Sequence, residues 1–120
     1  MTTSVFCTFR VAGFHHWPTA PDKYAYLRHA HRHVFYVRVD AKVEDKDRAI
    51  EFIEFKHHAE RRFGFLSNEG VSGRLMICDF GTRSCEQLAS ELLKQLLKDG
   101  YDVTRVEVSE DGENGGIIER

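Results

Sequence analysis

The chain has 120 residues, of which 42% are hydrophobic and 30% are charged, as is usual for a single globular domain, here residues 1–120. A net charge of -2 gives no electrostatic reason to expect a nucleic-acid partner, because such partners need a clustered basic face. No apolar run reaches the roughly 20 residues of a bilayer-spanning helix, and residues 1–10 lack the zones of a signal peptide, so we expect no membrane partner. Three cysteines without a paired spacing indicate reduced thiols and a cytoplasmic location.

The first predicted elements are two long β-strands. Residues 4–17 and residues 33–43 both alternate between apolar and polar side chains with period two, and odd-numbered positions form the apolar face of each. Residues 18–32 between them contain both prolines and are too long for a tight hairpin. We therefore predict two antiparallel strands joined by an extended loop.

Two helices follow the strands. Residues 45–63 have apolar side chains at helical spacing, with Asp45 or Asp47 as the N-cap candidate. Residues 84–100 are the clearest helix, because a Ser/Gln capping box opens the segment and a glycine ends its leucine-rich stripe. Residues 73–81 between the helices fit either a short strand or a buried loop.

Two further strands are predicted at residues 101–110 and 117–120, separated by the turn-rich residues 111–116. The predicted order is therefore strand, strand, helix, helix, strand, strand. This order predicts an α+β fold in which two helices pack on one face of a four-stranded antiparallel sheet.

The chain has seven histidines, and three of them share one face of the predicted sheet. Side chains alternate across a strand, and His15, His31 and His33 all have the parity of the apolar face. If the two long strands are antiparallel neighbours, the end of the first lies beside the start of the second, so the three imidazoles converge. Three imidazoles with an open fourth position are typical of a catalytic zinc site.

Other interpretations of these histidines stay open. A bulge near Gly13 would shift the parity and pass the ligand role of His15 to His16. His29 has the right parity but lies outside the predicted strand, so we expect it to contact a metal ligand rather than the metal, or to lie in solvent. The run HAHRH can also be a chance feature of a histidine-rich chain, with its histidines in surface or packing positions.

Five segments, spread from Phe9 to Ile118, match one protein family in the order in which they occur. They are FRVAGFHHWP, HRHVFYVRV, AIEFIEFK, SCEQLA and VTRVEVSEDGENGGII. The first two resemble the opening strand and the His-Gly-His motif of the 6-pyruvoyl- and 6-carboxy-tetrahydropterin synthases. The next two are similar to the starts of that family's helices, and the last resembles its closing strand, whose glutamate binds the pterin ring.

The resemblance implies the tunnelling fold, in which subunits join their sheets into a barrel. We therefore expect a homo-oligomer, a hexamer or another trimer-based assembly, with active sites at subunit interfaces. The resemblance implies Zn²⁺ on His15, His31 and His33, and a substrate-binding carboxylate at Glu110. The implied activity is that of a zinc-dependent carbon–oxygen or carbon–carbon lyase that acts on dihydroneopterin triphosphate or a related pterin or purine-derived compound. Without the resemblance, Glu110 would be read as an exposed acid at a strand end.

The general-base residues of the family are missing from this sequence. Leu27 stands at the position of the catalytic cysteine, and leucine cannot abstract a proton. Residues 61–69 contain neither the aspartate nor the histidine of the family's Asp-His pair, and Arg32 replaces the glycine between the two zinc histidines. The metal-binding and ring-binding positions are thus present, whereas the proton-transfer positions are not.

Three kinds of side chain are candidates for the missing catalytic role. His57 and His58 lie on the first predicted helix, and an imidazole pKa of about 6.5 suits proton transfer near neutral pH. Tyr24 and Tyr26 lie in the long loop and can donate a hydrogen bond or a proton. Cys85 begins the second helix, where the helix dipole would lower the thiol pKa. The simpler interpretation of each is a solvent-facing or packing residue.

Three functions therefore remain open from the sequence. The leading one is a zinc-dependent enzyme of the pterin synthase type. The second is a catalytically inactive pterin- or purine-binding module that keeps the zinc site and the ring pocket. The third is a structural metal protein, whose site a fourth protein ligand such as His29 would close.

Overall fold

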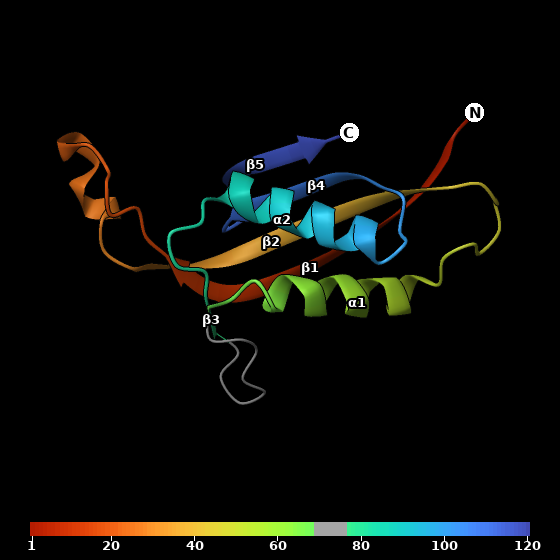
Figure 1. The fold of residues 1–120 in the computed structure, drawn as a ribbon, viewed down its shortest axis with the longest axis horizontal. Coiled ribbons are helices and arrows are strands. Elements are labelled where there is room, and N and C mark those ends of the chain that lie inside the picture. Colours follow the sequence, from red (N-terminus) through yellow and green to blue (C-terminus); the bar gives the residue numbers. More distant parts are fainter. Residues whose placement is uncertain (69–76) are drawn as a thin grey trace.

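The structure is a computed structural model that describes residues 1–68 and 77–120 (Figure 1). Its elements in chain order are β1 (Thr3–His15), the 3₁₀ helix η1 (Asp22–Leu27), β2 (His31–Val43), α1 (Phe52–Gly64), β3 (Ile77–Asp79), α2 (Cys85–Lys98), β4 (Val103–Glu110) and β5 (Asn114–Glu119). No helix in the described part of the chain is long and apolar enough to cross a membrane.

The sheet has five strands in the order β3-β1-β2-β4-β5. The pairs β1–β2, β2–β4 and β4–β5 are antiparallel, and β3 runs parallel to β1. The α+β class is confirmed, but the prediction of four antiparallel strands is wrong, because β3 adds a fifth, parallel strand. Three residues are too short to carry a periodic pattern. Residues 73–76 of the ambiguous segment lie outside the described residues.

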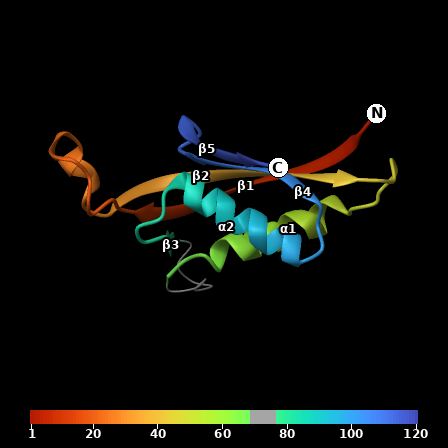
Figure 2. The ribbon, with the colours of Figure 1, turned by 45° about the horizontal axis from the view of Figure 1, so that its top comes forward.

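Both helices cover the same face of the sheet (Figure 2). The face towards the helices carries the odd-numbered residues of β1 and β2, in agreement with the predicted parity, and the core forms between these layers. The largest fully buried side chains include Phe35, Phe55, Phe63 and Phe80. Even-numbered residues point the other way, so that Phe6 on β1 is exposed.

Two predicted boundaries are wrong for identifiable reasons. Helix α1 begins at Phe52 because Glu51 caps it, its side chain accepting a hydrogen bond from the backbone N–H of Glu54, whereas residues 45–50 precede the helix. Strand β5 begins three residues earlier than predicted, since the glycines that indicate a turn are strand residues. A side chain at Gly116 would place its Cβ 3.0 Å from the backbone nitrogen of Glu86, so this close approach requires glycine.

Candidate metal centre

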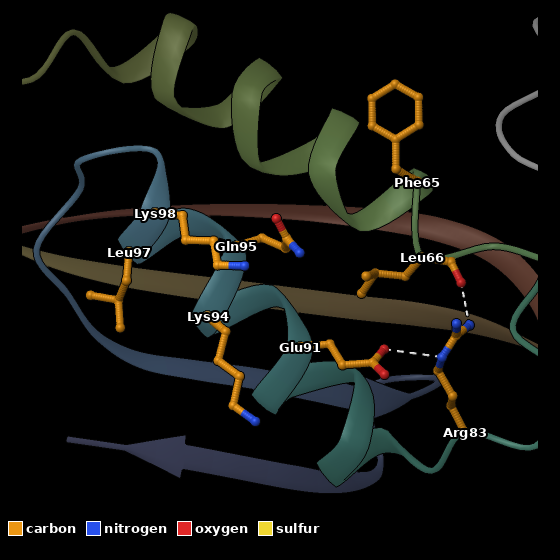
Figure 3. A pocket seen from close by; sticks show the side chains of 8 residues that line it. All are labelled: Phe65, Leu66, Arg83, Glu91, Lys94, Gln95, Leu97 and Lys98. Carbon is orange, nitrogen blue, oxygen red and sulfur yellow. Dashed lines mark hydrogen bonds and ion pairs between the residues drawn. The ribbon is translucent and has the colours of Figure 1, made fainter.

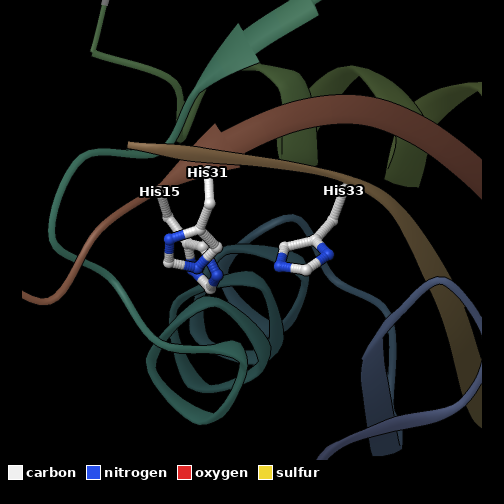
Figure 4. Close-up of side chains that lie close together, drawn as sticks. All are labelled: His15, His31 and His33. Carbon is white, nitrogen blue, oxygen red and sulfur yellow. The ribbon is translucent and has the colours of Figure 1, made fainter. Parts of the chain in front are cut away.

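The three predicted ligands converge at one end of the β1–β2 pair. The pairing runs without a bulge, with His15 opposite His31 and Gly13 opposite His33. The alternative in which His16 replaces His15 is therefore excluded by the register. One ligand atom from each of the three rings lies within 4.8 Å of the others, and the rings project to the same side of the strands (Figure 4).

The outer nitrogen of each ring is held by an acceptor that carries no proton. His15 Nδ1 is 2.8 Å from the carbonyl oxygen of Arg83, and His31 Nδ1 is 3.0 Å from that of His29. His33 Nδ1 is 2.8 Å from the Oδ2 of Asp111. Each Nδ1 therefore carries a hydrogen, and in the neutral imidazole this leaves a lone pair on Nε2. This is the tautomer that a metal-binding histidine needs, with the supporting partner that such ligands usually have.

A carboxylate faces two of these Nε2 atoms. Glu110 Oε1 lies 3.1 Å from His15 Nε2, and Glu110 Oε2 lies 3.3 Å from His33 Nε2. In the neutral tautomer a carboxylate oxygen and the imidazole Nε2 both present lone pairs, so a cation between them, either a proton or a metal ion, stabilises their contact. His15 Nε2 is also buried without a hydrogen-bond partner in the described structure. This buried, unpaired nitrogen fits a metal ion.

Burial also favours the neutral state of the first ligand. Burial lowers the pKa of His15 below its ordinary value, although the Arg83 carbonyl and the Glu110 carboxylate act in the opposite direction. Neutral imidazoles and a carboxylate form a donor set that suits zinc and related divalent metals. In a tetrahedral site with bonds of about 2.0 Å, the ligand atoms are roughly 3.3 Å apart, so binding would draw the imidazoles closer by small side-chain rotations.

Two supporting residues were not found by sequence reasoning. Asp111 adopts a left-handed backbone (φ 57°), and its Oδ1 accepts a hydrogen bond of 2.9 Å from the N–H of Val34 while its Oδ2 contacts His33. These two contacts lower the pKa of Asp111, with the backbone N–H contributing most. The Asp-Gly pair after the strand was the only available signal, and it indicated a turn rather than a residue that supports a ligand.

Arg83 is the second, and its side chain anchors the loop whose carbonyl holds His15. The guanidinium pairs with Glu91 at 3.0 Å and donates to the carbonyl oxygen of Leu66 (Figure 3). These contacts form one wall of a cavity of about 490 Å³ beside α2 and the end of α1, which also includes the exposed Phe65. The described residues that line this cavity do not include any of the three histidines.

The segment between the ligands forms an arm that extends beyond the sheet (Figure 1). The N–H of Trp17 donates to the carbonyl oxygen of Leu27 at 2.7 Å, and the Trp17 and Tyr24 rings stack at 6.2 Å. Leu27 is the last residue of η1. The side chain of Tyr26 is 72% exposed, and the structure shows no hydrogen bond from it to another described residue. His29 contributes its carbonyl oxygen to His31, and its imidazole is not part of the group of described side chains that could hold a metal ion.

The helix histidines lie away from the metal centre within one chain. His57 is exposed, and His58 Nε2 lies 2.6 Å from the Oδ2 of Asp99, the residue that caps the C-terminal end of α2. The metal centre lies at the N-terminal end of that 14-residue helix, which is about 20 Å long. Arg62 makes two hydrogen bonds of 2.7 Å to Asp99 and holds its pKa below the usual range. His58 thus belongs to a helix-capping cluster.

Cys85 lies against the metal centre, but as a protonated thiol. Its Sγ is 3.9 Å from Glu110 Oε1, and the residue is only 4% exposed. Burial, reinforced by the charge of Glu110, raises the thiol pKa to about 12, so the expected lowering by the helix dipole does not occur. The packing interpretation of Cys85 therefore holds, with a weak hydrogen bond to the carboxylate in addition.

Comparison with known proteins supports the fold. No protein-family model matches the sequence, and no curated protein matches it. The crystal structure of an uncharacterized protein from Wolinella succinogenes is similar, with a TM-score of 0.68 and 17% sequence identity, over 100% of this chain and 99% of that one. At this identity the similarity shows a shared fold alone.

Proposed function

We propose that this chain is a zinc-dependent lyase of the pterin synthase type that acts on dihydroneopterin triphosphate or a related pterin or purine-derived compound. The observation that carries the proposal is the convergence of three imidazoles with free Nε2 lone pairs, at the positions where the sequence resemblance implies zinc. The described fold is compatible with a tunnelling-fold subunit, in which two helices cover one face of the sheet.

In this proposal, different residues bind the metal ion and the pterin ring. A metal ion held by His15, His31 and His33 would supply Lewis-acid polarisation of substrate oxygens. The carboxylate of Glu110, which is 27% exposed beside these ligands, can accept two N–H bonds from the amidine edge of a pterin. The thiol of Cys85 donates weakly to the same carboxylate and helps to orient it.

A second candidate function, a binding module without turnover, is favoured by the apolar Leu27 at the position of the family's cysteine. Within one chain, the other candidates do not supply the base either, since His58 pairs with Asp99, Tyr26 extends from the arm, and Cys85 is a protonated thiol. An enzyme would therefore take its base from a neighbouring subunit. The exposed arm is suitably placed for contact with another copy, in line with active sites at subunit interfaces.

We also propose that the active form is a trimer-based homo-oligomer, such as a hexamer. Residues 3–11 of β1 pair only with β2 on one side among the described residues, and β5 is an outermost strand. Two unpaired strand edges per subunit allow neighbouring sheets to join. Light scattering coupled to size-exclusion chromatography tests this, and a monomer at micromolar concentration would contradict it.

The activity is tested by mass spectrometry of dihydroneopterin triphosphate after incubation with the zinc-loaded protein. We expect a product that is lost after chelation and in His31→Ala. The matched control is His16→Ala, which removes the imidazole directly after β1 that is not one of the three converging rings. If the substrate is bound but unchanged, the binding module is the correct function. If His31→Ala retains a full equivalent of metal, the site assignment itself is wrong.

A further inference from the structure

Glu110 lies closer to the metal ligands than ring binding alone requires. Both of its carboxylate oxygens contact an Nε2 atom, one on His15 and the other on His33. A carboxylate that served only to bind the substrate ring would point into the space that the ring fills. In this structure it instead points at the tips of the imidazoles.

The contact distances are those found between two ligands of one metal ion. For bonds of about 2.0–2.1 Å in a tetrahedron, neighbouring donor atoms are roughly 3.3–3.4 Å apart. The Glu110 oxygens lie 3.1 Å and 3.3 Å from the two nitrogens. His15 Nε2 is buried without a hydrogen-bond partner in the described structure, and in the neutral tautomer both nitrogens accept bonds only, so a shared metal ion explains these contacts directly.

We propose that in the substrate-free protein Glu110 is the fourth ligand of the metal, so that an incoming ligand must displace its carboxylate before reaching the ion. This inference rests on the proposed metal site at His15, His31 and His33 and assigns the position that a catalytic zinc site normally leaves to water. All four ligands of the metal are then protein side chains until the substrate displaces one of them.

The structure around Glu110 permits such a change without movement of the strand. The backbone is fixed, since Glu110 pairs with Phe35 on β2 and the next residue, Asp111, donates its N–H to the carbonyl oxygen of Val34 at 2.7 Å. The side chain itself is 27% exposed and has only the weak thiol donor of Cys85 as a further partner among the described residues. Rotation of the side chain alone can therefore move the carboxylate from the metal to a bound ring.

Cobalt(II)-loaded protein provides a test that does not depend on activity. The visible absorption of Co²⁺ reports its coordination, and azide is a small anion that can occupy an open position. In the wild type we expect azide to leave the spectrum nearly unchanged. In Glu110→Gln we expect a different resting spectrum, a clear response to azide and metal affinity lower by at least about tenfold, since even residues behind a ligand contribute that much.

The matched control is Glu113→Gln, which removes an exposed carboxylate in the turn that follows Glu110. It should behave as the wild type does. If Glu110→Gln binds Co²⁺ with the wild-type spectrum and affinity, or if azide perturbs the wild-type spectrum as strongly as that of the variant, Glu110 is not a ligand. If neither protein binds Co²⁺ and His31→Ala makes no difference, the metal site itself is wrong, which is a separate failure.

The azide response of the wild type keeps the test valid if Glu110→Gln folds poorly, because that measurement needs no substitution. Addition of dihydroneopterin triphosphate to the cobalt-loaded wild type then tests the opening step. We expect a spectral change with the substrate and none with inorganic triphosphate at equal concentration. A substrate that binds without altering the spectrum would show that the carboxylate stays on the metal, and would overturn the displacement.

Discussion

Asp111 is expected to determine which nitrogen of His33 is free to bind a metal. Its Oδ2 contacts His33 Nδ1 at 2.8 Å, and its Oδ1 accepts the N–H of Val34 at 2.9 Å. Both partners are N–H donors, so only a group with two acceptor atoms satisfies them together. We therefore expect metal affinity to fall when the carboxylate is removed, by about 10–100-fold, as for other residues that orient a metal-bound histidine.

Two substitutions separate this effect from backbone strain. Asp111→Gly removes the carboxylate but accepts the left-handed backbone (φ 57°), so the turn is retained. Asp111→Asn also tolerates this backbone but has one oxygen and one NH₂ group. If the NH₂ faces His33, the imidazole must accept there, and its hydrogen moves to Nε2, where it blocks the metal.

The more conservative substitution is therefore expected to be the more damaging one. We expect metal affinity to decrease in the order wild type, Asp111→Gly, Asp111→Asn, as measured by competition with a chromophoric chelator. Nitrogen-15 spectra of the imidazoles should show the proton of His33 on Nδ1 in the wild type and on Nε2 in Asp111→Asn. Glu113→Gln, in the same turn, should bind metal as the wild type does.

Two results would refute this reasoning. Affinity of Asp111→Gly within twofold of the wild type would show that His33 needs no supporting carboxylate. Tighter binding by Asp111→Asn than by Asp111→Gly would show that the tautomer of His33 is not set by this contact. Either result would leave the three-histidine site in place and remove Asp111 from it.

Other parts of the fold give three further predictions. Arg62 lowers the pKa of Asp99, so the stability from this pair is present above about pH 4 and is lost as the pH falls through the lowered pKa. In Asp99→Asn the melting temperature should therefore change less with pH between about pH 5 and pH 2 than it does in the wild type. An equal pH dependence in the two proteins would contradict this. Burial raises the pKa of Cys85 to about 12, so its alkylation by iodoacetamide at pH 8 should be far slower in the folded than in the unfolded protein. Mass spectrometry measures both rates, and equal rates would show that the thiol is accessible. Gly13→Ala places a Cβ 2.8 Å from the ring of Phe80, so urea unfolding should show a free energy of unfolding lower by about 1–3 kcal/mol. An unchanged midpoint would show that Phe80 moves aside without cost.

The metal centre was predictable because strand parity is a strict rule. The positions of His15, His31 and His33 follow from two alternating patterns and one antiparallel pairing, and the register realises that pairing without a bulge. The role of Asp111 was not predictable in this way. It depends on a left-handed turn 78 residues away from its partner His33, and no periodic pattern records such a contact.

The parts of the fold that escaped prediction are those where tertiary contacts outweigh local signals. The three residues of β3 become a strand only because β1 offers an edge beside Gly13. Gly116 indicates a turn by its residue type, yet it lies in β5. The residue there is glycine because α2 packs too closely for a side chain. Cys85 illustrates the same limit for chemistry, since burial overrides the helix dipole that the sequence suggested.

The arrangement of the three histidines does not depend on Leu27. The three histidines are held by the hydrogen-bonded ladder between two 13-residue strands. Their supporting partners come from the loop before α2, from His29 two residues before β2, and from the turn after β4. Leu27 lies instead on the arm between β1 and β2, whose internal contacts, such as the hydrogen bond from Trp17, are separate from this ladder. We therefore expect substitutions on the arm to leave the three histidines in place. Variants with substitutions on the arm should retain the metal, whereas variants with substitutions in the β1–β2 ladder should lose it.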